Sequence, residues 1–185
     1  VVDKHEMITR ESVTPDDVII GLHSPGLRSN GYSLARKVLF DTAKKSIHDP
    51  VWDGTDVTVG EELLRPSVIY TPTVLKVLEQ NQVKAIAHIT GGGLPGNVNR
   101  VLPDDMDAEI LKETWSPPRI FTEIQSLGNI DEGEMFKVFN MGIGMVLIVN
   151  QQSVDSTQEI IDATGLSSTQ IGTVKANGTG SVEIV

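Results

Sequence analysis

The sequence predicts an α+β fold built in layers, with a mixed sheet covered by helices. Short β-branched apolar runs, which are typical of buried strands, alternate along the chain with stretches whose apolar residues recur every three or four positions. Gly, Pro, Asn and Asp mark the boundaries between these stretches. The sequence contains no internal repeat and no low-complexity segment, so its 185 residues are expected to form one domain, or one domain with an appendage.

The first half of the chain is expected to begin with a polar connector and then to alternate strands and helices. The β-branched run at 17–22 predicts a short buried strand. The helix expected at 31–45 has apolar residues on one face and basic residues on the other, with Asn30 as its N-cap. In order, the expected elements are a connector at 3–17, a strand at 17–22, a helix at 31–45, a loop at 46–66, a helix that begins with Thr71 and Pro72, a strand at 83–90, and a short helix at 96–102 that Pro103 ends.

The second half continues the alternation. Ser156 and Glu159 have the spacing of a capping box, and Asn177-Gly178 is typical of a hairpin or tight turn. In order, we expect a strand at 107–112, a helix at 118–127 ended by Gly128, one or two helical turns at 131–138, a strand at 141–149, a helix at 153–163 stopped by Gly165, and strands at 170–176 and 181–185 on either side of the Asn-Gly turn.

The composition excludes several classes of function. The chain has no Cys, which excludes thiol catalysis, disulfides and Cys-ligated metals, and is consistent with a reducing compartment. A net charge of −10 argues against a nucleic-acid surface. The longest apolar run, at 145–149, is far too short to span a membrane, and no signal-peptide pattern opens the chain. We therefore expect a cytoplasmic protein that binds neither nucleic acid nor membrane.

The first residues are expected to belong to a longer protein. Residue 1 is Val rather than Met, and residues 3–17 are mostly polar or charged, with a turn at Thr14-Pro15. We expect residues 1–16 to be the end of an upstream domain and its connector, and residues 17–185 to form the domain that this chain contributes.

Three consecutive glycines, residues 91–93, follow the strand expected at 83–90. Such a run loses much conformational freedom unless backbone must come close to something, and its bare N–H groups form a natural anion cradle. A plain strand-to-helix turn is the alternative, and neither the Walker nor the Rossmann spacing is present. Because a helix with Asn97 and Arg100 follows the run, we expect both side chains to point back toward a bound phosphate, although a surface arginine one turn into the helix explains Arg100 without a ligand.

Two further segments also combine small residues with side chains that could bind a ligand. The turn at 28–31 comes after the first strand, and its N–H groups beside Arg28 would bind an anion, although helix capping explains the same residues without a ligand. In the segment 139–145, Gly142 and Gly144 clear one face of a strand. That bare face is explained either by a packed helix or by a ligand that the Asn140 side chain reaches.

The histidines and acidic pairs do not predict a metal site. His5, His23, His48 and His88 lack the spacing of paired metal ligands, and the acidic pairs fall in polar connectors where solvated charge is expected. His88 closes a strand, where an imidazole is more often packed and hydrogen-bonded than catalytic.

Together these segments resemble the aminoimidazole ribonucleotide synthetase family, also called phosphoribosylformylglycinamidine cyclo-ligases. The resemblance keeps the family's order and spacing over nearly the whole chain. The segments that carry it are Val18-Ile19-Ile20-Gly21-Leu22, Ser24-Pro25-Gly26-Leu27-Arg28-Ser29-Asn30-Gly31-Tyr32-Ser33-Leu34, Leu63-Leu64-Arg65-Pro66-Ser67-Val68-Ile69-Tyr70, Ala87-His88-Ile89-Thr90-Gly91-Gly92-Gly93-Leu94, Asn97, Arg100, Pro118, Ile120-Phe121, Gly128, Glu134-Met135 and Phe139-Asn140-Met141-Gly142-Ile143-Gly144-Met145.

The resemblance covers only the family's C-terminal half. It implies the layered domain that faces the substrate in an ATP-dependent ring closure, in which formylglycinamidine ribonucleotide becomes aminoimidazole ribonucleotide in purine biosynthesis and ADP and phosphate are released. It also implies that ATP and Mg²⁺ are bound mainly by the missing N-terminal half, that this half is the partner of the domain and forms a homodimer, and that residues 1–4 are its last strand. The isolated chain is expected to be inactive alone.

This reaction needs anion-binding backbone more than covalent help from the protein, and the family resemblance places that backbone in the two glycine turns. We expect His88 to transfer protons, because its side chain is the only one nearby with a suitable pKa. The expected substrate- and phosphate-binding residues are Arg28, Ser29, Asn30, Gly31, Thr90, Gly91, Gly92, Gly93, Asn97, Arg100 and Asn140.

This chain departs from the family in its first turn. The family usually has His before Ser-Asn-Gly and often Ser at the position of Pro25, whereas this chain has Arg28. Arginine does not usefully deprotonate but can clamp a phosphate, so the chain could belong to a divergent paralogue. Selenophosphate synthetase, thiamine monophosphate kinase, the hydrogenase-maturation dehydratase, the upstream amidotransferase and a non-catalytic phosphate-binding domain are the competing candidates. The pairing of the segments 29–33 and 89–93 favours the cyclo-ligase.

Overall fold

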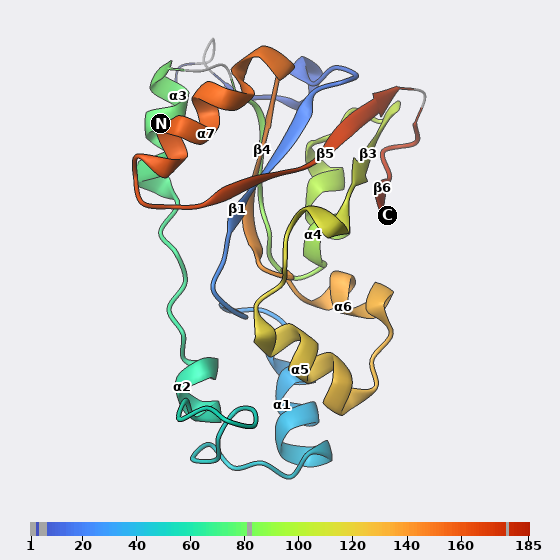
Figure 1. Ribbon diagram of the computed structural model, residues 1–185. Coiled ribbons are helices and arrows are strands. Elements are labelled where there is room, and N and C mark those ends of the chain that lie inside the picture. Colours follow the sequence, from blue (N-terminus) through green and yellow to red (C-terminus); the bar gives the residue numbers. More distant parts are fainter. Residues whose placement is uncertain (1–2, 4–6, 81–82, 177) are drawn as a thin grey trace.

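A six-stranded mixed sheet organises the computed structural model, which describes residues 3, 7–80, 83–176 and 178–185 (Figure 1). Across the sheet the strands run in the order β2-β4-β1-β5-β3-β6. The neighbours are antiparallel except β3 and β6, which are parallel, so the expected mixed sheet is confirmed. Within the described residues, no two strands that are consecutive in the sequence are paired. The strands are β1 (Val18–His23), β2 (Val83–His88), β3 (Met106–Ile110), β4 (Ile143–Val149), β5 (Ser168–Ala176) and β6 (Val182–Ile184).

Helices cover both faces of this sheet. On one face, Val77 of α3 and Ile161 of α7 pack against Ile20 and Leu147. The other face carries the larger apolar cluster, to which α1, α4, α5 and α6 contribute. The helices are α1 (Tyr32–Arg36), which continues as a π-helical segment (Lys37–Thr42), then α2 (Val59–Leu63), α3 (Thr71–Gln80), α4 (Gly93–Val98), α5 (Arg119–Gly128), α6 (Glu132–Val138) and α7 (Val154–Asp162). No helix within the described ranges has both the length and the apolar character that crossing a membrane requires.

Several predicted helix boundaries are wrong. Helix α1 begins after Gly31, which has a φ of 80° and is the N-cap residue, so Asn30 does not cap it. The Ser156–Glu159 pair lies inside α7 rather than at its start, because Val154 already packs into the core as the first helical residue. Helix α4 begins at Gly93, three residues earlier than predicted, so the glycine run itself enters the helix.

The segment predicted as a loop at 46–66 contains the short helix α2. Thr58 caps it: its hydroxyl accepts a hydrogen bond from the N–H of Glu61, and the Glu61 carboxylate accepts one from the N–H of Thr58. This reciprocal pair is the capping box that the Thr-x-x-Glu spacing indicates.

Of the two alternatives predicted for Asn177-Gly178, the hairpin is wrong, and the tight turn stays a prediction because Asn177 lies outside the described residues. Strands β5 and β6 do not pair with each other; they lie on opposite sides of β3. The reason is the Asp107 carboxylate on β3, which accepts hydrogen bonds of 2.8 Å from the N–H groups of both Thr179 and Ser181. These bonds draw the chain across β3 instead of back along β5.

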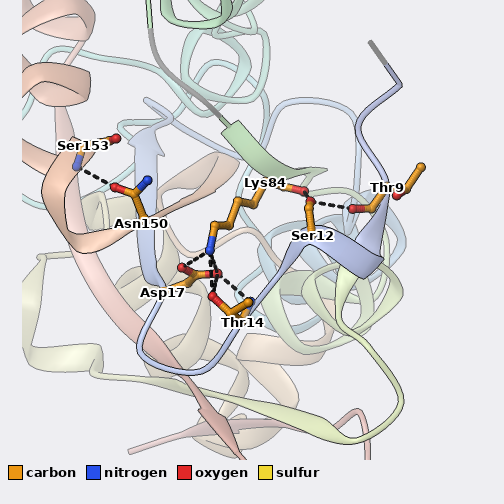
Figure 2. Close-up of polar contacts among 7 residues, drawn as sticks. All are labelled: Thr9, Ser12, Thr14, Asp17, Lys84, Asn150 and Ser153. Atoms are coloured by element: carbon orange, nitrogen blue, oxygen red, sulfur yellow. Dashed lines mark hydrogen bonds and ion pairs between the residues drawn. The ribbon is translucent and has the colours of Figure 1, made fainter. Parts of the chain in front are cut away.

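The expected connector packs against the start of β2 (Figure 2). The Lys84 ammonium lies 2.7 and 2.9 Å from the two carboxylate oxygens of Asp17 and 2.7 Å from the Thr14 hydroxyl. The Ser12 hydroxyl donates to the carbonyl of Lys84 at 2.9 Å. Residues 1–2 and 4 of the expected upstream strand lie outside the described residues.

Candidate functional site

The sheet topology brings the three glycine-rich segments to one edge. Strands β1 and β2 are both antiparallel to β4, so they run in the same direction and end at the same edge of the sheet. His23 is paired with Ile143 and His88 with Met145, which places the start of β4 at that edge as well. The turns that follow β1 and β2, and the segment that precedes β4, therefore meet.

The first two turns lie next to each other, and we call the region between residues 28–31 and 90–93 the cleft. The side-chain oxygen Oδ1 of Asn30 lies 3.6 Å from the position that a Cβ atom on Gly91 would occupy. Ser29, Gly91 and Gly92 are exposed there. Within the described part of the chain, the N–H groups of Gly91 and Gly92 have no hydrogen-bond acceptor, so both are available to an anionic ligand.

The glycines differ in what they do. Gly93 is required by packing: it has a φ of 59°, and a Cβ atom on it would lie 1.8 Å from the carbonyl oxygen of Phe136. Gly31 is also required by packing, because the Phe139 ring lies 2.4 Å from the position that its Cβ atom would occupy. Gly92 has a φ of 98°, which a side chain would strain. Among Gly31, Gly91, Gly92 and Gly93, only Gly91 has both an ordinary φ and room for a side chain. Neither backbone conformation nor packing therefore explains why this residue is glycine.

Asn97 and Thr90 brace the glycine turn from inside. The Asn97 amide is buried and donates to the carbonyl of Gly93 at 2.7 Å and to that of Gly91 at 3.3 Å. Its oxygen accepts a hydrogen bond of 3.0 Å from the Thr90 hydroxyl. The two side chains therefore shape the turn and are already engaged with the protein.

Asn140 has the same role in the first turn. Its buried amide donates to the carbonyl of Gly26 at 2.9 Å, and its oxygen accepts from the N–H of Gly142 at 2.7 Å. The side chain predicted to reach a ligand thus joins the turn after β1 to the segment before β4.

A cluster of Arg28, Tyr70 and His88 closes the end of the cleft. The Arg28 guanidinium donates to the carbonyl of Gly144 at 2.8 Å and to that of Ile89 at 3.3 Å, and it lies 5.6 Å from the centre of the Tyr70 ring. Its other terminal nitrogen contacts Nε2 of His88. The guanidinium predicted to clamp a phosphate is therefore turned toward the protein.

The bare face predicted from Gly142 and Gly144 is occupied by this cluster at Gly144 and by the start of α5 at Gly142, where a Cβ atom would lie 2.6 Å from Cδ of Pro118. A Cβ atom on Gly144 would lie 2.0 Å from the Tyr70 hydroxyl and 2.6 Å from the Arg28 guanidinium. Burial lowers the pKa of His88, and the neighbouring Arg28 charge lowers it further. Burial raises the pKa of Tyr70, which Arg28 partly offsets. Each shift favours the uncharged form of the side chain.

Arg100 lies away from the cleft. Because α4 begins at Gly93, Arg100 stands seven residues further along, or about 10 Å at the rise of a helix. It lines a second cavity of about 290 Å³ together with Thr9, Arg10 and Ile86. The structure does not bring this residue to the glycine turns.

Three residues near the cleft carry no individual prediction in the sequence. Tyr70 belongs by pattern to the apolar stripe of α3, yet its hydroxyl donates to the carbonyl of His23 at 2.7 Å. Glu62 is buried and paired with Arg65 at 2.5 Å, and the Arg65 side chain lies 3.4 Å from the Cβ position of Gly26. For Arg65 and Tyr70 the only signal is the segment 63–70 that contains them, and Glu62 lies one residue before it.

The described residues contain no group of three or more His, Asp or Glu side chains placed to hold a metal ion. His5 lies outside the described part of the chain.

Comparison with protein families gives one match, to the family described as AIR synthase related protein, C-terminal domain, over residues 14–185. The phosphoribosylformylglycinamidine cyclo-ligase of Thermodesulfovibrio yellowstonii is 42% identical over 184 residues, which are 100% of this chain and 53% of that protein. The enzyme of the same name from Brevibacillus brevis is 47% identical over 176 residues, 95% of this chain and 51% of that protein. The chain spans about half the length of the curated relatives it matches.

Solved structures share the fold at low sequence identity. The hydrogenase maturation protein HypE covers the whole chain with a TM-score of 0.65 at 14% identity, over 53% of its own length. Thiamine-monophosphate kinase from Stenotrophomonas maltophilia also has a TM-score of 0.65 at 14% identity, over 99% of this chain and 54% of its own. T. maritima PurL complexed with FGAR has a TM-score of 0.58 at 13% identity, over 100% of this chain and 28% of its own. These likenesses confirm the predicted fold class.

Proposed function

We propose, from the premise that this chain belongs to the family of AIR synthase related proteins and spans their C-terminal domain, that it is the substrate-side half of a phosphoribosylformylglycinamidine cyclo-ligase. The whole enzyme would use ATP to phosphorylate the formyl amide oxygen of formylglycinamidine ribonucleotide. The amidine nitrogen would then displace phosphate and close the imidazole ring, leaving aminoimidazole ribonucleotide, ADP and phosphate. The observation that carries the proposal is the meeting of the two glycine-rich turns at one edge of the sheet, in a chain 42–47% identical to enzymes of that name.

The residues divide between ligand binding and support. The free N–H groups of Gly91 and Gly92, facing Ser29 and Asn30, suit the oxygens of a phosphate-bearing substrate. His88 stands at the end of the same cleft, where the reacting amide would lie. Support comes from the residues engaged with the protein: Arg28, Gly31, Thr90, Gly93, Asn97 and Asn140.

The same proposal assigns ATP and Mg²⁺ to the other half of the enzyme. The curated relatives are about twice as long as this chain, which supports a second domain as its partner. That half would precede residue 17, hold the nucleotide and its metal ion, and form the homodimer of a cytoplasmic enzyme. Leu64 and Ile69, which are 83% and 78% exposed, offer that half an apolar surface.

Kinases and dehydratases of the same fold are a weaker alternative. HypE and thiamine-monophosphate kinase match the fold at 14% identity, whereas the cyclo-ligases match the sequence at 42–47%. A phosphate-binding domain without catalysis would keep the glycine cleft but would not need the other half. Turnover in the joined protein separates these functions.

The test uses the full-length enzyme, in which this chain is joined to its preceding half, and measures ATP-dependent formation of aminoimidazole ribonucleotide. We expect Gly91→Val to raise the KM for formylglycinamidine ribonucleotide by about 10- to 100-fold, the range that one lost hydrogen bond to a charged group implies. The fold should survive, because a Cβ atom at Gly91 meets only Asn30 at 3.6 Å.

Gly96→Val is the matched control, because a Cβ atom at Gly96 meets nothing within 4 Å. An unchanged KM in a folded Gly91→Val protein would contradict the glycine site. A wild-type enzyme that binds ATP but forms no product would contradict the cyclo-ligase assignment itself.

A further inference from the structure

We propose that Arg28 is a positioning residue that makes His88 a fixed, uncharged hydrogen-bond donor in the cleft instead of a group that transfers protons. The proposal deepens the proposed function, since it assigns a role within the same cleft, but its geometry stands on the contacts of this chain alone.

The guanidinium of Arg28 is held in one orientation. One terminal nitrogen donates to two carbonyls, those of Gly144 and Ile89, and the guanidinium lies over the face of Tyr70. The Arg28 backbone has a φ of 66°, and its Nε atom is buried with no partner in the described chain. With these contacts in place, the second terminal nitrogen is directed at His88.

A guanidinium only donates hydrogen bonds, so the proton positions on His88 follow from this contact. The Nε2 atom facing Arg28 must accept, and must therefore carry a lone pair and no proton. The single proton of the neutral ring is then on Nδ1, which has no hydrogen-bond partner among the described residues. The ring offers the cleft one N–H donor.

This arrangement removes the two usual proton-transfer roles. Nδ1 cannot take up a proton because it already has one, and Nε2 cannot because Arg28 occupies its lone pair. Giving up the Nδ1 proton would leave an imidazolate anion. What remains is hydrogen-bond donation, which suits the phosphorylated oxygen as it takes up the electron pair of the breaking C–O bond and leaves with the phosphate.

The charged and titratable surroundings support the neutral ring. Tyr70 donates its hydroxyl proton to the carbonyl of His23, and the His23 ring contacts Thr169 at 2.8 Å. No carboxylate in the described part of the chain contacts the cluster of Arg28, Tyr70 and His88. A protonated His88 would therefore face the Arg28 cation with no compensating anion, which is consistent with its lowered pKa.

The first experiment is ¹⁵N NMR of the His88 ring in this chain as it stands, followed by pH titration. We expect a pyrrole-type signal at Nδ1, a pyridine-type signal at Nε2, and a titration midpoint below the ordinary value near 6.5. An Nε2–H tautomer, or an ordinary midpoint in the wild-type chain, would overturn the proposal. His23 serves as the internal reference, since Arg28 makes no contact with its ring.

Variants separate positioning from general structure. In Arg28→Met the His88 midpoint should rise and its two tautomers should mix, while Arg28→Lys, which retains a donor, should restore much of the wild-type behaviour. Arg36→Met, on the exposed side of α1, is the control and should leave His88 unchanged. If Arg28→Met does not fold, Arg28→Lys and the wild-type spectra still decide the question.

The outcome is independent of the enzymatic assignment. If the joined enzyme forms no product but His88 has the expected tautomer and midpoint, the cyclo-ligase assignment fails and the positioning role stands. If the enzyme is active but His88 has the Nε2–H tautomer or an ordinary midpoint, the positioning role fails and the enzymatic assignment stands.

Discussion

Two buried asparagines show how single residues build the cleft without facing it. Asn97 holds the carbonyls of the glycine turn, and Asn140 joins the turn after β1 to the segment before β4. A buried amide is costly unless its donors and acceptor are satisfied; Asn140 is satisfied by backbone, and Asn97 by backbone together with the Thr90 hydroxyl. Asparagine is therefore present at both positions because its amide can hydrogen-bond the main chain of the turns around the site.

Replacing Asn140 with alanine should destabilise the domain. The change leaves the Gly142 N–H without a partner and the Gly26 carbonyl with only a 3.3 Å hydrogen bond from the Ser24 hydroxyl, at a cost of about 1–3 kcal/mol in the free energy of unfolding. Urea denaturation measures it, with Asn99→Ala, at an exposed asparagine, as the matched control. Equal stability of the two variants would show that Asn140 does not brace the turn.

At the residue scale, the sequence predicts which segments form the candidate site. It predicts less well which side chains in those segments point toward a ligand. The structure places the Asn30 side-chain oxygen 3.6 Å from the Cβ position of Gly91, while their binding of one ligand stays a prediction. The direction of Asn97 and Arg100 depends on where α4 starts, and Gly93 starts it three residues early because it fits against the carbonyl of Phe136. That contact comes from α6, which is distant along the chain, and no local pattern reports it.

At the scale of elements, the connector and the first two strands are joined by a buried ion pair. The side chains of Asp17 and Lys84 are 4% and 13% exposed, and they meet at 2.7 Å where β1 and β2 begin (Figure 2). Thr14 completes the group by accepting a hydrogen bond from Lys84. Removing one partner of a buried pair leaves the other charge without compensation, which is the expensive case.

Lys84→Met should therefore lower the free energy of unfolding by about 3–5 kcal/mol. Lys112→Met is the control, because the Lys112–Glu132 pair is exposed and should contribute about 0–1 kcal/mol. Thermal or urea denaturation measures both. The double variant Asp17→Asn/Lys84→Met should recover part of the loss, and no recovery would mean that Lys84 acts through packing alone.

Most elements were predictable because their signals are local. The six strands and the long helices carry their period within short stretches of sequence. The pairing of β6 was not predictable, because it is set by the Asp107 carboxylate on a distant strand. Helix α2 was predictable in principle from Thr58 and Glu61, although Asp, Gly and Pro around it indicate a loop.

At the scale of the molecule, exposed apolar side chains mark where the proposed second half would dock. Leu64 and Ile69 flank the segment that joins α2 to α3, and both are largely exposed. In the joined enzyme we expect both to be buried, since burying one such side chain contributes about 1.5–3 kcal/mol.

The double variant Leu64→Ser/Ile69→Ser should weaken binding of this chain to a separately produced preceding half by about tenfold or more. Its own stability should change by no more than about 0.5 kcal/mol, because both positions are on the surface. Calorimetric titration measures the affinity, with Val185→Ser, at the far end of the sheet, as the control. Affinity equal to that of the wild type would place the interface elsewhere.

The strand order also governs when the domain can form during synthesis. β1, β2 and β3 have no partner among themselves, and each pairs only with strands that begin at or after Ile143. A nascent chain that has not reached that residue carries the three strand segments β1, β2 and β3 without any strand to pair with. Such long-range pairing folds slowly and leaves strand edges open to aggregation. We therefore expect that nearly all of this domain must be synthesised before its hydrophobic core can form. Until then, its strands are unpaired and available for chaperones to bind.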